Sequence, residues 1–475
     1  MGSGRTFAAI LLLFTGETGW LAVTSRFPMA FDEAYHFGLI QFFSHRLNPI
    51  VTTQSSSTYK FGALIQGPSL LYHYLLSFPY RFVALFSHSL VTEVIVLRLI
   101  NVGFAVATLI IMRKLLRFTT LSDGSVNLIV LIFALTPIVT ALSAQINYDN
   151  LLILMTTLCV YETILFSRKI EENVFDIKNL LVLLCLCLFS SLVQYSFLPI
   201  FVAFLAIVIW KCHSYKRRQN IQLRLAAQKS FKHLGKYTKL ALLATGILGS
   251  LLFIRIYGVN VVKYHNPAPQ CNQVLNTADC KRYYAWNSNY KLRQYFKAHP
   301  TSRTLNLVQY DAYWLMTVSV SLFCAILPLH GPYYLSPVYY FMMLVFMSGG
   351  IVCAGANFKR MMRADSVLPI LFVISLVYVL SLWARNYHDY LQLGATIAIG
   401  GRYLLPVLAC LYVLLVRGVQ YAIQSRPRKT QPIITIGLGF LIIVSFIYYG
   451  GFMQYVTHIT PKYGKLSATN DFGMN

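Results

Sequence analysis

The stretch "LVLLCLCLFSSLVQYSFLPIFVAFLAIVIW", Leu181 to Trp210, decides the class of fold. It runs for 30 residues without a charged side chain, and a helix needs about 20 apolar residues to cross a hydrocarbon core about 30 Å thick. Apolar and polar residues do not alternate along it, as they would in the strands of a membrane barrel. Similar apolar blocks recur along the chain. The sequence therefore predicts an all-α, polytopic integral membrane protein.

The composition agrees with a membrane-embedded chain. Hydrophobic residues make up 57% of the 475 positions and charged residues 12%, which is about half the charged share of a soluble domain. The formal net charge is +25. The basic residues cluster at the ends of apolar blocks, as cytoplasmic anchors do. We therefore expect membrane lipids as partners and no nucleic acid.

Five basic clusters predict the topology. If all of them lie on the cytoplasmic side, the N-terminus is cytoplasmic and the C-terminus is on the outer face of what we expect to be the plasma membrane. The clusters lie at 113–117, 167–169, 211–239, 359–363 and 426–429. About eleven spans follow: 7–24, 90–112, 125–143, 149–166, 179–194, 195–210, 240–258, 333–355, 366–384, 400–418 and 433–450.

One apolar segment, 313–329, does not fit this alternation, because a span there would put the last two basic clusters outside. We expect it to be re-entrant or interfacial on the outer side. The chain then divides into a transmembrane module at 1–260, an outer loop at 261–332 and a C-terminal transmembrane module at 333–475. The first outer loop, 24–89, is long and is expected to carry interfacial helices.

The second outer loop contains Cys271 and Cys280 within the polar segment "HNPAPQCNQVLNTADCKRYY". The other cysteines that lie in apolar runs are expected to behave as small hydrophobic residues. In an oxidising outer compartment, a disulfide between Cys271 and Cys280 is the expected state.

The first outer loop begins with "FDEAYHFGLI", which sets two of only 15 acidic residues side by side. Asp32 could cap an interfacial helix, with Glu33 favoured in the first turn by the helix dipole. The spacing also lets both carboxylates approach His36. Carboxylates packed among aromatic residues at the water–lipid boundary can acquire a pKa suited to base catalysis. One divalent metal ion on Asp32 or Glu33 is an alternative.

"FDEAYHFGLI" resembles the F-D-E-x-H-F-G stretch of protein O-mannosyltransferases, which belong to the GT-C glycosyltransferase superfamily. "GGRYLLP", Gly400 to Pro406, and "SAQINYDNLL", Ser143 to Leu152, are similar to stretches of related, uncharacterised bacterial membrane families. The resemblance covers roughly residues 1–260 and "GGRYLLP". One extra residue between the acids and His36 departs from the pattern, so the donor sugar and the acceptor do not carry over.

The resemblance implies a GT-C fold and a glycosyltransferase that uses a polyprenyl-phosphate sugar on the outer face. The acceptor would be a hydroxyl of a glycan, a lipid or a protein. Asp32 would be the base. Glu33 would orient Asp32, the acceptor or an ion. His36 would position the two carboxylates or the substrate.

The leaving polyprenyl phosphate needs cations, and Arg can bind phosphate bidentately. The candidates for phosphate binding are Arg402 with its neighbour Tyr403, followed by Lys60 with Tyr59. Further candidates for substrate binding are His73, Asp149 and Arg385.

Each candidate has a structural alternative. Arg402 could extend from a helix end to the membrane surface, Lys60 could be a solvated charge, and Asp149 could cap the next span. Three carboxylates lie within apolar spans, and Arg98 or Arg255 could pair with them: Glu17, Glu93 and Glu162.

Two rival functions use similar residues. A lipid-linked glycan polymerase or ligase would differ only in the acceptor. A lipid-linked sugar transporter or flippase would be expected to show internal repeats, and no repeat is seen. The paired carboxylates lie at the membrane boundary and not at the midplane, which favours chemistry over passage.

Overall fold

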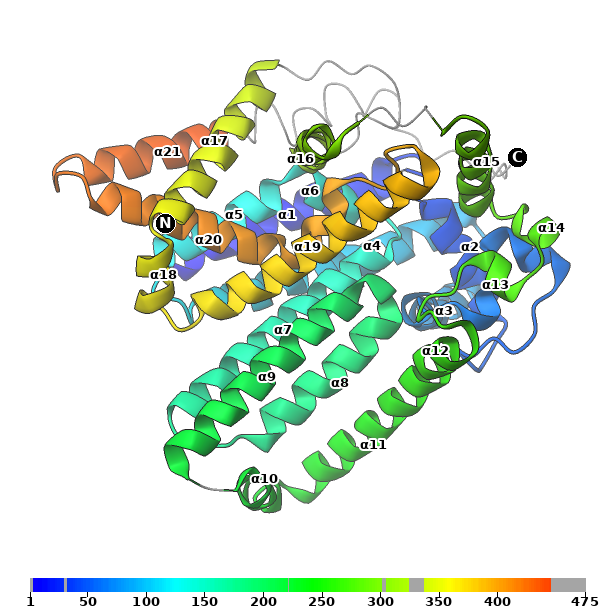
Figure 1. Cartoon of the computed structure of the whole chain (residues 1–475), viewed down its shortest axis with the longest axis horizontal. Helices are drawn as coiled ribbons and strands as arrows, with labels where there is room; N and C mark the ends of the chain where they lie inside the picture. The colour runs from blue at the N-terminus through cyan, green and yellow to red at the C-terminus, as the bar shows by residue number, and fades with distance from the viewer. Residues whose placement is uncertain (1–2, 30–31, 221, 301–304, 324–336, 446–475) are drawn as a thin grey trace.

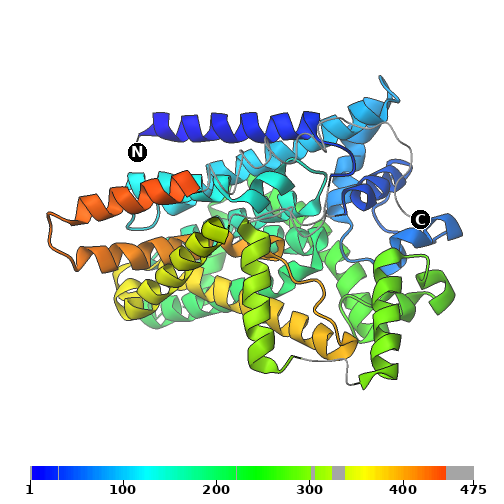
Figure 2. The same cartoon turned by 90° about the horizontal axis from the view of Figure 1, so that it is seen from above.

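The structure, a computed structural model, describes residues 3–29, 32–220, 222–300, 305–323 and 337–445. Within these ranges all the regular elements are helices, which confirms the all-α prediction. The long helices form a bundle, and many short helices gather at one end of it (Figure 1, right side; Figure 2).

Seven helical segments in the described part of the chain are long and apolar enough to cross a membrane. They confirm that the chain is a polytopic membrane protein. The segments are α1 (Gly4–Thr24), α4 (Leu90–Leu116), α7 (Tyr148–Glu171), η3 with α9 (Tyr195–Phe197 and Leu198–Gln219), α11 with η4 and α12 (Lys236–Phe253, Ile254–Gly258 and Val259–Tyr264), α19 (Leu368–Leu393), and η7 with α20 (Gly401–Leu404 and Leu405–Gln424).

Two bent helix pairs raise the number of candidate spans to nine. α5 (Asp123–Leu135) and α6 (Pro137–Ser143) meet at 65°, and α17 (Pro337–Ala356) and α18 (Phe358–Ala364) meet at 71°. The first bend has a local cause, because Pro137 has no N–H for the helical ladder and favours a helix start. Two shorter apolar helices, α8 (Ile177–Val193) and α21 (Gln431–Ser445), lie where the two remaining expected spans fall, 179–194 and 433–450.

Contacts in or beside four of the five basic clusters join them at one end of the bundle, as the predicted topology requires. Arg168 donates to the carbonyl of Phe118 at 2.6 Å, and Lys211 forms an ion pair with Glu171 at 2.8 Å. The carboxylate of Glu171 also accepts from Ser366 at 3.1 Å. The amphipathic helix α10 (Leu223–Lys232) follows the third cluster. Which side of the membrane this end faces stays a prediction.

The opposite end carries the short helices of the two outer loops. The first loop forms α2 (Glu33–Ser44), η1 (Ser56–Phe61), η2 (Leu64–Gln66) and α3 (Leu71–Ala84); the second forms α13 (Cys271–Val274), α14 (Thr277–Cys280) and α15 (Tyr284–Ala298). α3 exposes an apolar row that suits an interfacial helix: Leu75, Phe78 and Phe82. A disulfide joins Cys271 and Cys280, which confirms the predicted pair.

The apolar face of α2 is buried inside the protein and does not simply lie on the membrane. Phe37, Ile40 and Phe43 are each at most 2% exposed. Phe37 belongs to the main hydrophobic core together with residues of α3 and α4. The helix that follows Asp32 is therefore fixed to the bundle, so the groups at its N-terminus are held in place.

The segment 313–329 is described only in part. α16 (Leu307–Phe323) is seen almost end-on in Figure 1, where α7, α9 and α19 lie in the plane of the picture, and in Figure 2 it crosses their direction. It is not among the candidate spans. This orientation suits a helix along the membrane surface. Residues 324–329 and the predicted outer C-terminus lie outside the described residues.

Candidate functional site

A cavity of about 1560 Å³ lies at the end of the bundle that carries the short helices. Its walls come from both outer loops and from α7, α19 and η7. Nine of the ten predicted catalytic and binding residues line it, and Tyr59 is the exception. The nine are Asp32, Glu33, His36, Lys60, His73, Asp149, Arg385, Arg402 and Tyr403.

Asp32 and Arg402 face each other at this cavity. Asp32 lies just before α2 in a left-handed conformation with a φ of 65°, and its side chain makes no capping hydrogen bond. One of its carboxylate oxygens lies 3.5 Å from Nη2 of Arg402. The Asp32 side chain is 65% exposed and that of Arg402 17%. The fold thus brings together Asp32 and Arg402, which are 370 residues apart in the sequence.

Arg402 is held by its own surroundings. The chain before it is fixed to α16, because the backbone N–H of Gly401 donates to the hydroxyl of Ser321. The guanidinium lies 4.9 Å from the ring centre of Tyr403 and donates to its hydroxyl at 2.9 Å. An arginine held in this way presents an oriented cation to the cavity.

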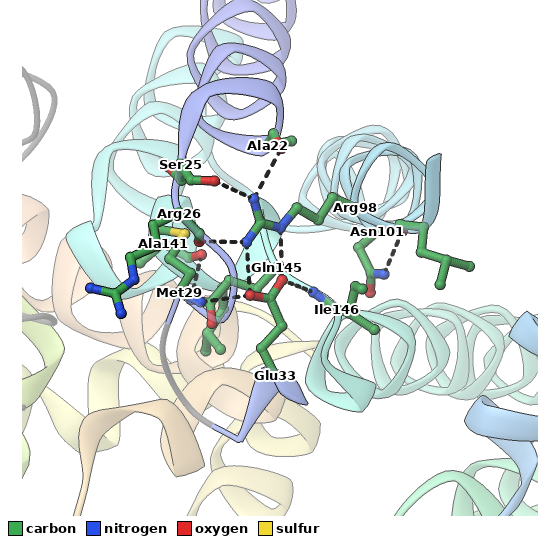
Figure 3. Close-up of polar contacts among 12 residues, drawn as sticks. Ala22, Ser25, Arg26, Met29, Glu33, Arg98, Asn101, Ala141, Gln145 and Ile146 are labelled. Carbon is green, nitrogen blue, oxygen red and sulfur yellow. Dashed lines mark hydrogen bonds and ion pairs between the residues drawn. The ribbon is translucent and has the colours of Figure 1, made fainter. Parts of the chain in front are cut away.

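Glu33, next to Asp32, has a different environment. It forms a two-point ion pair with Arg98, at 2.7 Å from Nε and 2.8 Å from Nη2, and both side chains are fully buried. Its two oxygens also accept from the backbone N–H groups of Met29 and Ile146. The remaining N–H groups of Arg98 reach carbonyls at the end of α1, those of Ala22, Ser25 and Arg26 (Figure 3).

These contacts correct two expectations. Arg98 pairs with Glu33, and not with Glu17, Glu93 or Glu162. Glu33 does not turn toward Asp32, because four hydrogen bonds, two of them from the guanidinium of Arg98, already hold its carboxylate. The pair ties the first outer loop to α1, to α4 and to the corner between α6 and α7. A two-residue acidic motif has thus been split between a buried anchor and a carboxylate that faces the cavity.

Asp149 is not the cap of α7. The side chain of Asn147 performs that function by accepting from the backbone N–H of Asp149 at 2.9 Å. The carboxylate of Asp149 is buried at the cavity wall, 8% exposed for the residue. It lies within electrostatic reach of Asp32 and Arg402. It is therefore the second carboxylate at this part of the cavity.

His36 pairs with His73 and not with the carboxylates. Nδ1 of His36 lies 2.9 Å from Nε2 of His73, and Nδ1 of His73 lies 3.2 Å from the carbonyl oxygen of Ser69. Because a carbonyl only accepts, Nδ1 of His73 carries its proton and Nε2 is the acceptor. Nδ1 of His36 must then donate, which leaves Nε2 of His36 as an acceptor.

Burial favours the neutral form of both rings. It lowers the pKa of His73 from 6.5 to about 3. It also lowers the pKa of His36 well below its usual range, helped by the neighbouring His73 and by the charge of Arg402. The sequence spacing within α2 suggested convergence with Asp32 and Glu33, but no local signal pointed to a partner 37 residues away.

The remaining predicted residues contact aromatic side chains or cations. The ammonium of Lys60 lies 5.3 Å from the ring centre of Phe61. The ring of Tyr59 lies 5.7 Å from the guanidinium of Arg282. Arg385 lies 4.8 Å from the ring centre of Tyr195 and 4.0 Å from Asp389. Sequence reasoning missed further lining residues, among them Arg282 and Tyr283, whose loop gave only a general excess of aromatic and basic residues. It also missed Tyr148 at the start of α7 and Tyr195 in η3.

The residues suggested for a divalent ion do not fit one. The oxygens of Glu33 are taken by protein donors, and Asp32 faces a guanidinium. Within the described ranges, no group of three or more His, Cys, Asp or Glu side chains is arranged to hold a metal ion. No step below depends on a metal.

The chain is similar in structure to two solved oligosaccharyltransferases. The first is the archaeal AglB from Archaeoglobus fulgidus in complex with an inhibitory peptide and a dolichol-phosphate, with a TM-score of 0.45 and 12% identity. The second is an Archaeoglobus fulgidus oligosaccharyltransferase in the apo form, with a TM-score of 0.48 and 13% identity.

The matches cover 97% and 96% of this chain, but only 56% and 59% of those proteins. The chain therefore spans a little over half the length of the structures it matches. No protein-family model and no curated protein matches it in sequence. At this identity the likeness concerns the arrangement of the helices and assigns no residue of this chain a role. What stands is a polytopic, all-helical membrane protein.

Proposed function

We propose that this protein is a GT-C-type membrane glycosyltransferase that moves a sugar from a polyprenyl-phosphate donor to an acceptor hydroxyl on the outer face. The observation that carries the proposal is the pair of Asp32 and Arg402 at the wall of a cavity of about 1560 Å³. One group can take up a proton and the other can bind an anion. Outside the cell no nucleotide sugar is supplied, so the donor is lipid-linked.

The two groups suit the two charges that develop during such a transfer. The acceptor oxygen forms a bond to the anomeric carbon as the bond from that carbon to the phosphate oxygen breaks. Asp32 takes the hydroxyl proton, and the polyprenyl phosphate leaves as an anion. Arg402 binds that anion, and a preorganised cation at a developing charge lowers the barrier by several kcal/mol.

The neighbouring residues have supporting roles in this proposal. Arg402 donates to the hydroxyl of Tyr403, which keeps the guanidinium oriented. Asp149 and Arg385 line the same cavity and are suited to hydroxyls and phosphate of the substrates. His36 offers a neutral acceptor nitrogen to a sugar or acceptor hydroxyl. Glu33 anchors the loop that carries Asp32, and we assign it no chemical step.

The test compares Asp32→Asn with Asp279→Asn, a partly exposed aspartate of α14 that does not line the cavity. A general base contributes about 10²–10⁴-fold to a rate, so we expect Asp32→Asn to remove the product while the protein inserts normally. Mass spectrometry of envelope glycans from cells carrying each variant measures this without knowledge of the sugar. A glycan profile unchanged by Asp32→Asn refutes the proposed function; Asp279→Asn should match the wild type.

A further inference from the structure

One wall of the cavity is basic and aromatic. We define the basic wall as Lys281, Arg282, Lys291 and Arg293, which all line the cavity together with Lys60. Within the described residues, none of these five lies within 4.0 Å of a carboxylate oxygen. The buried Nε–H of Arg293 also finds no hydrogen-bond acceptor there. A positive surface without counter-charges lines the cavity.

The cavity as a whole is short of negative charge. Seven Lys and Arg residues line it against four Asp and Glu residues, and one of the four, Glu33, is already neutralised by Arg98. Of the other carboxylates, Asp32 is paired with Arg402 and Asp389 with Arg385. The donor's single phosphate, assigned to Arg402, would leave the basic wall uncompensated. The basic wall therefore requires a second anionic group, in addition to the donor's phosphate.

The basic wall is built into the fold and is not a free loop. The disulfide between Cys271 and Cys280 ends directly before Lys281. The ring of Tyr283 stacks on Tyr35 with 5.9 Å between the ring centres and lies against the backbone of Gly62, where a Cβ would approach it to 2.9 Å. At the other end of α15, Phe296 lies against Gly394 in the same way.

Aromatic side chains lie between the cations. Tyr283, Tyr284, Trp286 and Tyr290 line the cavity, Trp286 and Tyr290 are stacked, and the ammonium of Lys281 lies 5.2 Å from the ring centre of Tyr290. Flat rings offer apolar faces to sugars, and cations pair with carboxylates or phosphates. Outer segments of membrane proteins usually carry few Lys and Arg, so this accumulation calls for a ligand.

We propose that the basic wall binds the acceptor and that the acceptor is an anionic glycan, one that carries carboxylate or phosphate groups. Only the ligand's role as acceptor rests on the proposed function. Binding of an anionic glycan to the basic wall needs neither the donor nor turnover. Membrane lipid headgroups share this chemistry, and the experiment separates the two sources.

The test measures binding to the full chain in nanodiscs of phosphatidylcholine without donor. The probes are tetragalacturonate, a tri(glycerol phosphate), and neutral maltotetraose. We expect at least one of the two anionic probes to bind about tenfold or more tighter than maltotetraose at low salt, with a difference that shrinks near 1 M salt, where the screening length falls to about 3 Å. Equal affinities for all three probes overturn the proposal.

The variant K281Q/R282Q/K291Q should reduce binding of the anionic probe about tenfold and leave maltotetraose unchanged. The matched control is K263Q/K297Q, two exposed lysines of the same loop that do not line the cavity. An equal loss in both variants, or none in the triple variant, overturns the proposal.

Nanodiscs with phosphatidylglycerol identify the source of the anion. If the wall binds lipid headgroups, this lipid displaces the glycan from the wild type, and the proposal fails; retained binding supports it. The outcome is independent of the proposed function: anionic binding together with an unchanged glycan profile for Asp32→Asn would refute the transferase and leave the anionic ligand in place.

Discussion

At the scale of single residues, the pair of Glu33 and Arg98 is predicted to be structural. Arg98→Ala leaves the Glu33 carboxylate buried without its counter-charge, which costs about 3–5 kcal/mol. The control is Arg117→Ala, which removes an ion pair whose side chains are 47% and 48% exposed, so it should cost about 1 kcal/mol or less. Denaturation in mixed micelles measures both. Equal losses would contradict the anchoring role of Glu33.

The two buried histidines give a second prediction at this scale. ¹⁵N NMR of histidine-labelled protein in lipid, assigned with His36→Asn and His73→Asn, should show protonated Nδ1 and bare Nε2 on both rings. Because burial lowers the pKa of His73 to about 3, this ring should stay neutral at pH 5, and the lowered pKa of His36 favours its neutral form as well. A proton on Nε2 of His36 would contradict the assignment in which His73 donates to the carbonyl of Ser69 and His36 donates to His73.

The same shifts fix the sign of a pH effect on stability. Between an unfolded pKa of about 6.5 and the lowered folded values, the unfolded chain binds more protons than the folded one. These two histidines therefore contribute stability above about pH 6.5, and that contribution falls as the pH drops. His73→Asn should reduce the slope of stability against pH in this range.

At the scale of elements, apolar length predicted where most helices lie but not where they end. The uncharged run from Leu181 to Trp210 is too long for one span, and it divides at Gln194, which has an extended backbone between α8 and η3. α7 and α9 continue to Glu171 and Gln219, beyond the expected ends, because polar residues extend a helix past the apolar segment. Hydropathy does not detect those turns.

Local breaks and short helices were harder to predict. Residues 125–143 were expected to form one span, and the bend at Pro137 divides them. The helices around the disulfide, α13 and α14, have four residues each. Elements this short depend on tertiary contacts rather than on their own propensity, so no pattern in the sequence marks them.

At the scale of the whole molecule, residue chemistry predicted which residues line the cavity but not how they pair. Asp32 and Glu33 are adjacent, yet Asp32 has left-handed backbone and Glu33 begins α2, so their side chains leave the chain in different directions. One reaches Arg402 and the other Arg98, 370 and 65 residues away. Such partners are chosen by the packing of distant helices, which a single sequence does not encode locally.

The orientation of the molecule gives the last prediction. Lys263→Cys lies at the cavity end and Lys429→Cys in the last basic cluster, and both native residues are exposed. A membrane-impermeant maleimide on intact cells should label the first variant and reach the second only after permeabilisation. The unsubstituted chain is the control, because Cys271 and Cys280 are bonded to each other. The reverse pattern would place the cavity on the cytoplasmic side, where nucleotide sugars are available, and would remove the reason for a lipid-linked donor.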